Sequence, residues 1–149
     1  MSVSVRHATA RDHESIVAFQ KAMAWETAGL ELDASNVDRG VQQILLGNVP
    51  GIYLIAEIKE EVVGCVMVNP EWIDWSGKMQ LWLNSIYVLP EYRRMGILRA
   101  LFNFVVENSS PETQVRIKLY VDRHNERAVE AYKAMGMTEQ HYRMLELPI

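Results

Sequence analysis

The sequence predicts an α/β (α+β) fold, in which a central mixed, mostly antiparallel sheet carries helices on both faces. Three observations predict this class. Apolar, β-branched runs of strand length recur along the chain, segments with helical spacing of apolar residues lie between some of them, and 149 residues suffice for one core. We therefore expect a single domain over residues 1–149, with the order β-α-α-β-β-β-α-β-α-β.

The first half of the chain is expected to form one strand, two helices and a hairpin. Each helix follows a sequence that resembles a capping box, Thr9-x-x-Asp12 or Ser35-x-x-Asp38, and apolar residues then recur at helical spacing. An acidic linker, residues 25–33, separates the two helices. The expected strands are residues 3–8, 52–58 and 62–68, the last two joined by a polar turn at 59–61.

The second half alternates strands and helices. Residues 69–78 predict a loop rich in aromatic and acidic side chains, and a linker is expected at 108–111. Gly136 is expected to end the last helix. The expected elements are a strand over 79–89, a helix to about Val106, a strand over 115–121, a helix over 125–135 and a final strand over 141–147.

Composition excludes several classes of protein. No apolar run approaches the roughly 18 residues that a membrane-spanning helix needs, and the first residues lack the apolar core of a secretory signal. Cys65 is the only cysteine, so no intramolecular disulfide can form, and a reducing, cytoplasmic location is expected. A net charge of −4 argues against nucleic acid as a partner, and the four histidines show no metal-binding spacing.

The segment YVLPEYRRMGILRAL, residues 87–101, joins a strand to a helix. The amino terminus of a helix leaves about four N–H groups unpaired at the positive end of the helix dipole, which suits an anion. Gly96 allows close approach to the backbone, and the nearby arginines add charge-assisted hydrogen bonds. The segment predicts a pyrophosphate site, although glycine in a turn and arginine near a helix are also common for structural reasons.

Two motifs together resemble the GNAT superfamily of N-acetyltransferases. Residues 93–98, RRMGIL, after Val88 and Pro90, are similar to the family's acyl-CoA-binding pattern Q/R-x-x-G-x-G/A, with leucine at the last position. Residues 119–137, LYVDRHNERAVEAYKAMGM, are similar to its V-x-x-x-N-x-x-A-x-x-x-Y-x-x-x-G-F segment, with methionine at the end. The resemblance extends over roughly residues 3–147.

This resemblance implies acetyl-CoA as cofactor and direct acetyl transfer to a primary amine in a ternary complex. Tyr132 would be the general acid that protonates the CoA thiolate, although helical spacing with Ala128, Ala131 and Met135 also fits a core aromatic residue. The strand ending near Val88 would be splayed from the next strand, often by a β-bulge, so that its free backbone binds pantetheine. The implied cofactor-binding residues are Ile86, Tyr87, Val88, Arg93, Arg94, Met95, Gly96, Ile97, Leu98, Arg99 and Asn125.

The acceptor side lacks an obvious base. Trp82 occupies the position on the central strand where many relatives carry a glutamate. Carboxylates interleaved with tryptophans in two flanking loops predict a cationic or amphipathic amine, either a small molecule or a peptide end, because aromatic faces attract cations. Solvated acidic loops would have the same composition. The candidate acceptor-binding residues are Trp25, Glu26, Glu31, Glu71, Trp75 and Trp82, with Asp33 and Asp74 as further carboxylates.

Other functions remain open at this stage. A CoA-binding sensor or interaction module would keep the fold without catalysis, which Leu98 and the absent strand glutamate favour. An acetyltransferase associated with a protein or with charged tRNA is disfavoured by the acidic net charge. A homodimer is compatible with the sequence, and the expected carboxyl-terminal strand is a segment that could pair across it.

Overall fold

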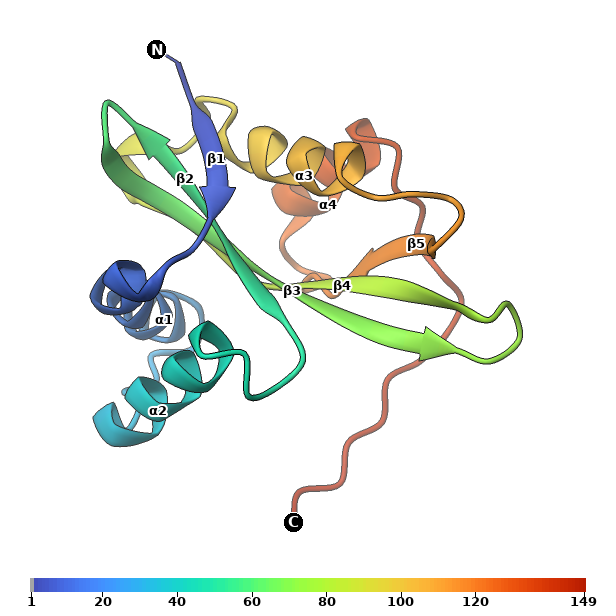
Figure 1. Ribbon diagram of the computed structural model, residues 1–149, viewed down its shortest axis with the longest axis horizontal. Helices are drawn as coiled ribbons and strands as arrows, with labels where there is room; N and C mark the ends of the chain where they lie inside the picture. The colour runs from blue at the N-terminus through green and yellow to red at the C-terminus, as the bar shows by residue number, and fades with distance from the viewer. Residues whose placement is uncertain (1) are drawn as a thin grey trace.

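The computed structural model describes residues 2–149. Figure 1 shows one sheet with helices on either side. The helices and strands are β1 (Ser4–His7), α1 (His13–Ala28), α2 (Ala34–Leu45), β2 (Ile52–Ile58), β3 (Glu61–Ile73), β4 (Lys78–Val88), α3 (Ile97–Glu107), β5 (Gln114–Leu119) and α4 (Glu126–Ala134), with 3₁₀ turns at Ala10–Asp12 and Pro90–Tyr92. None of the helices in this range combines the length and apolar character that crossing a bilayer requires.

The five strands form one sheet in the order β1-β2-β3-β4-β5. The first four strands pair antiparallel, whereas β4 and β5 pair parallel. A parallel neighbour needs a crossover, which α3 supplies between β4 and β5. The predicted mixed, mostly antiparallel sheet is confirmed.

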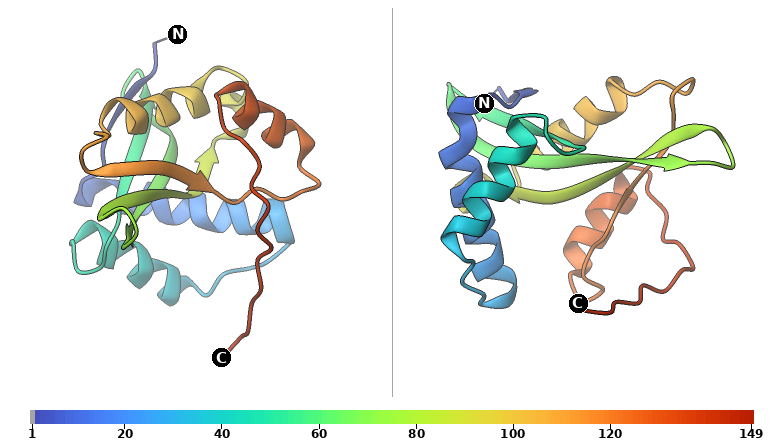
Figure 2. Two further views of the ribbon diagram at one scale, coloured as in Figure 1. Left: turned by 90° about the vertical axis from the view of Figure 1, so that its right-hand side faces the viewer. Right: turned by 60° about the horizontal axis from the view of Figure 1, so that its bottom comes forward.

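Helices cover both faces of the sheet, as the rotated views in Figure 2 show. On the α1/α2 face, Ile16 and Phe19 of α1 pack with Ile55, Cys65 and Tyr87. On the opposite face, a second cluster joins β2, β3 and β4 to Ile97, Leu101, Phe102 and Val105 of α3, with Met135 and Met137 packed at its edge. Burial of each large apolar side chain contributes about 1.5–3 kcal/mol, so both faces hold the sheet.

The first two helices differ from their predicted boundaries. Asp12 closes the predicted box at the first helix, since its carboxylate accepts from the Thr9 N–H at 2.7 Å. The box predicted at Ser35 is wrong: Asp33 caps α2, and its carboxylate accepts from the Asn36 N–H at 2.9 Å. Because α1 continues to Ala28, the first four residues of the expected linker are helical, and two of them, Trp25 and Glu26, matter below.

The predicted loop over 69–78 is also wrong. Strand β3 continues to Ile73 and pairs with β4, in a register that sets Asn69 opposite Trp82 and Glu71 opposite Gln80. Only residues 74–77 form the turn. Aromatic and acidic side chains suited an exposed loop, but they also suit an exposed sheet edge, which β3 becomes beyond Val68, where its pairing with β2 stops.

The final strand predicted over 141–147 does not form. Residues 138–149, here called the C-terminal tail, contain no helix or strand, and Figures 1 and 2 show them running away from the sheet beyond α4. The apolar pattern of a strand is present, but a strand also needs a partner edge, and this tail does not pair with β5.

Candidate active site

Strand β4 loses one of its two neighbours half-way along. Residues Met79–Leu83 pair with β5, whereas Asn84–Val88 pair with β3 alone. The backbone groups of this second half that face β5 therefore have no strand partner, which is unusual inside a sheet. Such an internal edge can accept an extended, amide-containing ligand as an added strand.

A β-bulge accompanies the loss of pairing. Cys65 lies opposite Tyr87 and Met67 opposite Asn84, so two steps along β3 match three steps along β4. Ser85, in the bulged stretch of β4 between Asn84 and Tyr87, has a φ of +50°. A bulge bends its strand and increases the local twist, which explains how β4 diverges from β5 beyond Leu83.

The end of β4 leads directly to the start of α3. Gly96, with a φ of +82°, precedes the helix, and no side chain caps its first turn. Ile97 is 1% exposed in the core on the α3 face, which fixes the helix start in place. A Cβ at Gly96 would meet nothing within 4 Å, so the glycine is needed for its left-handed backbone and faces open space. The uncapped N–H groups and this open approach suit an anion.

Arg93 connects this turn to the opposite face of the sheet. Its guanidinium pairs with the Glu26 carboxylate at 3.0 and 3.2 Å and lies over the Tyr87 ring, 5.4 Å from its centroid. Its Nε donates to the Val88 carbonyl at 2.9 Å. The Tyr87 hydroxyl also donates to Glu26, at 3.4 Å. One arginine thus joins the end of α1, the turn before α3 and the half of β4 without a β5 partner, Asn84–Val88, here called the free half of β4.

The other residues of the turn differ in what they offer. Arg94 and Arg99 are exposed, and within residues 2–149 neither forms an ion pair, so their charges are available to an anion. Met95 is exposed as well, and Leu98 is half-buried. Ile97 offers only its backbone, because its side chain is in the core.

Helix α4 follows β5 and begins at Asn125. The Asn125 side chain caps it by accepting from the Ala128 N–H at 3.2 Å. Tyr132 lies further along α4 and is half-buried, and this burial raises the pKa of its phenol. Met135 and Met137 pack against the core near this end of the chain. Tyr132 is therefore protonated at neutral pH, as a proton donor requires.

The other side of β4 carries a polar and aromatic surface. Gln80, Trp82 and Asn84 alternate along the strand, so they share the face that is opposite to Leu81 and Leu83. Glu71 on β3 accepts from Gln80 and, at 3.1 Å, from the Trp82 indole N–H. We call Glu71, Gln80, Trp82, Asn84, Lys118 and Tyr120 the polar strand face.

Strand β5 completes the polar strand face. Tyr120, just after β5, stacks on Trp82 with 4.7 Å between ring centroids, and the Lys118 ammonium lies 5.6 Å from the same indole. The hydrogen bond from Trp82, followed by that from Gln80, lowers the pKa of Glu71. Glu71 is therefore ionised at neutral pH and presents a negative charge on this face.

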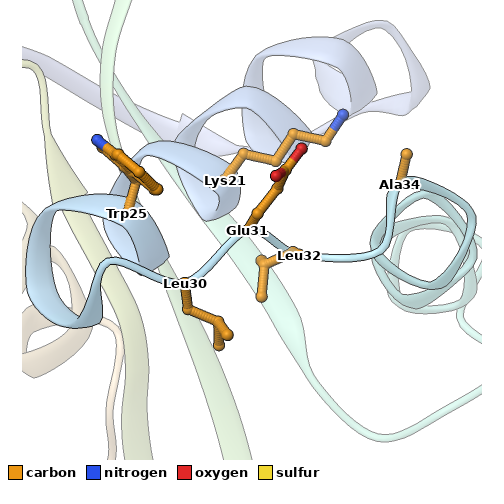
Figure 3. A pocket seen from close by; sticks show the side chains of 6 residues that line it. All are labelled: Lys21, Trp25, Leu30, Glu31, Leu32 and Ala34. Carbon is orange, nitrogen blue, oxygen red and sulfur yellow. The ribbon is translucent and has the colours of Figure 1, made fainter.

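A hollow lies between the end of α1 and the start of α2. It has a volume of about 280 Å³, and Figure 3 shows the side chains around it, with the Glu31 carboxylate beside the Lys21 side chain. Trp25, 65% exposed, forms one wall. The lining residues are Lys21, Trp25, Leu30, Glu31, Leu32 and Ala34.

Comparison with known proteins decides the family. The profile of the Acetyltransferase (GNAT) family matches residues 11–137, which is most of the chain. The chain belongs to this family. A "possible acetyltransferase" from Clostridium difficile 630 is 34% identical, with a TM-score of 0.89 over 100% of this chain and 99% of that one.

Curated relatives of this GNAT chain match over shorter segments. The thialysine N-epsilon-acetyltransferase of Bos taurus is 35% identical over 75 residues, which are 50% of this chain and 44% of that protein. An uncharacterised N-acetyltransferase of Methanocaldococcus jannaschii is 29% identical over 89 residues, 59% of this chain and 39% of that protein. The matched segments thus span less than half the length of either curated relative. The predicted superfamily and fold class are confirmed.

The GNAT fold sorts the predicted acceptor residues into separate places. Glu26 contacts the turn before α3 through Arg93, Glu71 and Trp82 belong to the polar strand face, and Trp25 lies with Glu31 in the hollow beside α1. Trp75 is not brought to any of them: it is 98% exposed in the β3–β4 turn, at the far end of the ribbon from α1 in Figure 1.

Sequence reasoning missed most of the polar strand face. Gln80, Asn84, Lys118 and Tyr120 were not predicted to belong to a site in this GNAT chain. The signal that could have found them is the run Gln80, Trp82, Asn84, since polar residues at every second position of a central strand are unusual. Gln80 is 3% exposed and its amide oxygen lacks a partner among the described residues, which marks the same spot.

Proposed function

We propose that this chain transfers an acetyl group from acetyl-CoA to a primary amine that is cationic or amphipathic. The observation that carries the proposal is the pairing of two binding features at one place: the free half of β4 ends where the uncapped start of α3 begins. One feature suits the amides of pantetheine and the other suits a pyrophosphate. Family membership supports the same cofactor.

The residues present fit CoA. The backbone N–H groups at the start of α3, with Gly96 open in front and the free arginines Arg94 and Arg99, would hold the pyrophosphate. Leu98 does not prevent this, because it lies within the helix while Gly96 provides the approach. Arg93, held by Glu26, would bind phosphate only after leaving that partner, so we assign it to the acceptor side.

Acetyl-CoA supplies an activated acyl group as a thioester. The backbone of Ile86–Val88 would hold the pantetheine arm, and a free N–H of the same stretch would stabilise the charge that develops on the acyl oxygen. The Val88 carbonyl already accepts from Arg93, which leaves the groups before it for the ligand. The bulge around Ser85 is what turns these groups outward.

Glu26 is the carboxylate that we place next to the reacting amine. It contacts Tyr87, whose backbone belongs to the free half of β4, and it is fixed by the two bonds from Arg93. An alkylammonium must lose its proton before it can attack, and its pKa lies about three units above neutral pH. Glu26 would hold the ammonium beside the free half of β4 and pass its proton to water.

The polar strand face would bind the rest of the acceptor. Ionised Glu71 attracts a second positive group, and the stacked pair Trp82 and Tyr120 offers an aromatic surface to the carbon skeleton. The similarity to the thialysine N-epsilon-acetyltransferase of Bos taurus supports a small amine as the acceptor. Lys118 beside Trp82 would favour an acceptor that also carries a carboxylate, as an amino acid does.

Tyr132 would protonate the departing thiolate. Burial raises the pKa of its phenol, which keeps it protonated at neutral pH and therefore able to donate a proton to the thiolate. Asn125 would act through the helix that it caps, by fixing the first turn of α4 and thus the position of Tyr132.

The test is CoA release from acetyl-CoA with a panel of amines that includes lysine-like amino acids, polyamines, aminoglycosides and peptides. We expect turnover with small cationic amines and a loss of about a hundredfold in kcat for Tyr132→Phe, with the affinity for acetyl-CoA unchanged. Turnover confined to neutral or acidic acceptors would contradict the proposed acceptor. Tight cofactor binding without turnover on any amine, unaffected by Tyr132→Phe, would instead make the chain a CoA-binding sensor.

A further inference from the structure

Gly64 lies in β3 next to the free half of β4. It is buried and pairs with Val88, the last residue of that half. Unlike Gly96, it has no left-handed backbone, so its conformation does not require a glycine. A glycine weakens the interior of a strand and often marks a place where another backbone comes close. The space around Gly64, and not its backbone angles, therefore explains why a glycine stands there.

Neighbouring atoms fill the space that a side chain at Gly64 would need. A Cβ there would lie 2.8 Å from the Tyr87 carbonyl oxygen and 3.3 Å from Cγ2 of Ile97. The Tyr87 carbonyl belongs to the backbone and cannot rotate away, and Ile97 is 1% exposed at the start of α3. Because a close-packed interior has no room to absorb a methyl group, β3, β4 and α3 keep these positions only with a hydrogen atom at residue 64.

The same glycine contacts both features that we assign to the cofactor. Tyr87 lies in the free half of β4, whereas Ile97 begins the helix whose N–H groups would hold the pyrophosphate. CoA carries its pantetheine arm and its pyrophosphate in one molecule, so both parts bind together only where the two sites have the matching spacing. Residues 89–96 join the two features along the chain, and Gly64 is a packing contact between them.

The next residue of β3 fixes the same stretch of β4 in a second way. Cys65 is fully buried opposite Tyr87, and its thiol donates to the Ser85 carbonyl at 3.6 Å. Ser85 is the residue of the bulge with a φ of +50°. Two successive residues of β3 thus determine where the free half of β4 lies, one by close approach and one by a hydrogen bond.

We propose that Gly64 is a positioning residue for CoA, which sets the distance between the free half of β4 and the start of α3. This inference rests on the proposed function, because it assigns the two ends of that distance to pantetheine and pyrophosphate. Gly64 acts through Tyr87 and Ile97 and does not itself touch the cofactor. A methyl group at residue 64 would push the two features apart. Each half of CoA would still find its own site, but the intact molecule would no longer fit both.

Calorimetry of Gly64→Ala with CoA and with its two halves tests this role. The halves are pantetheine and adenosine 3′-phosphate 5′-diphosphate. We expect the affinity for CoA to fall by about tenfold or more and the affinity for either half to change by less than about threefold, because only the intact molecule depends on the spacing. Val68→Ala is the matched control: Val68 is 6% exposed on the same strand, and this substitution removes packing without adding an atom near Tyr87. It should lower the melting temperature and leave the affinity for CoA unchanged.

A second variant covers the case in which Gly64→Ala does not fold. Gly64→Ala combined with Ile97→Leu removes the contact at 3.3 Å, since leucine has no Cγ2, and leaves the contact with the Tyr87 carbonyl. The same difference between CoA and its halves is expected. An unchanged affinity for CoA, or a parallel loss for all three ligands, would overturn the role of Gly64 alone. If the unaltered chain binds no CoA, both this inference and the proposed function are wrong.

Discussion

Replacing Glu26 by glutamine separates a structural ion pair from a catalytic carboxylate. The substitution keeps the size of the side chain and leaves Arg93 and Tyr87 with a neutral partner. Both members of the ion pair are substantially exposed, Arg93 at 46% and Glu26 at 36% of the side chain. Exposed pairs of this kind contribute only about 0.2–1 kcal/mol to stability, because water screens them. For a chain of this size that corresponds to a melting temperature lower by at most about 4 °C.

The effect on catalysis should be far larger than the effect on stability. If Glu26 holds the amine and relays its proton, its loss should lower kcat/KM for the amine by about a hundredfold or more, while acetyl-CoA binding is unchanged. That corresponds to at least about 2.7 kcal/mol of transition-state stabilisation, well above what the ion pair gives to the fold.

The assay is steady-state CoA release at saturating acetyl-CoA, with thermal unfolding measured on the same samples. Glu107→Gln, an exposed carboxylate at the end of α3, is the matched control and should change neither quantity. If Glu26→Gln keeps kcat/KM within about twofold of the wild type, or if activity falls only as far as the folded fraction falls, the assignment of Glu26 is wrong.

Three further predictions concern the turn, the core thiol and acid stability. Gly96→Ala should lower the free energy of unfolding by about 1–2 kcal/mol, because the backbone there is left-handed although the space is open. Gly96→Trp should in addition abolish acetyl-CoA binding, as measured by calorimetry. Gly40→Ala in α2 is the control: the site is equally uncrowded but has ordinary helical backbone, so this substitution should raise the free energy of unfolding. Burial raises the pKa of Cys65 to about 12, so a thiol reagent at pH 8 should label the native chain about a thousandfold more slowly than the unfolded one, and a rapid one-equivalent burst would contradict this. Arg6 holds the pKa of Asp12 below its ordinary value, so the stability from this pair is present above about pH 4 and is lost as the pH falls through the folded-state pKa. Asp12→Asn should lower the free energy of unfolding by about 1–3 kcal/mol at pH 7 and flatten the acid side of the plot of stability against pH. An unchanged plot would refute the pairing.

Local patterns predicted the elements whose signals are themselves local. The helices α1, α3 and α4 and the strands β2 and β5 lie within a few residues of their predicted ranges, since apolar periodicity and the glycines that end helices act over short distances. The start of α2 was missed because Asp33 and Ser35 are both good caps, and only the path of the chain selects Asp33. The final strand was wrongly predicted for a different reason, since pairing depends on an edge that the segment itself does not encode.

The candidate site likewise has one part that a local sequence pattern predicts and other parts that depend on contacts between distant segments. The start of α3 was predictable, because a glycine and arginines between a strand and a helix define it in one short segment. The polar strand face was not, because it combines β3, β4 and β5 through a register that no single segment contains. The contact between Glu26 and Arg93 joins residues 67 positions apart, so no local sequence pattern indicates it.

One irregularity in β4 accounts for the placement of both halves of the candidate site. Where β4 is paired on both sides, its side chains Gln80 and Trp82 lie on the polar strand face, the proposed acceptor side, of a central strand. Beyond the bulge at Ser85 the same strand keeps β3 but not β5, which frees its backbone for a ligand without detaching it from the core. A continuous strand paired on both sides would have been more stable and would have had no free backbone to offer. The bulge is therefore the feature that leaves an unpaired edge inside a stable sheet, and in the proposed complex its position would place the acyl group between the polar strand face and the start of α3.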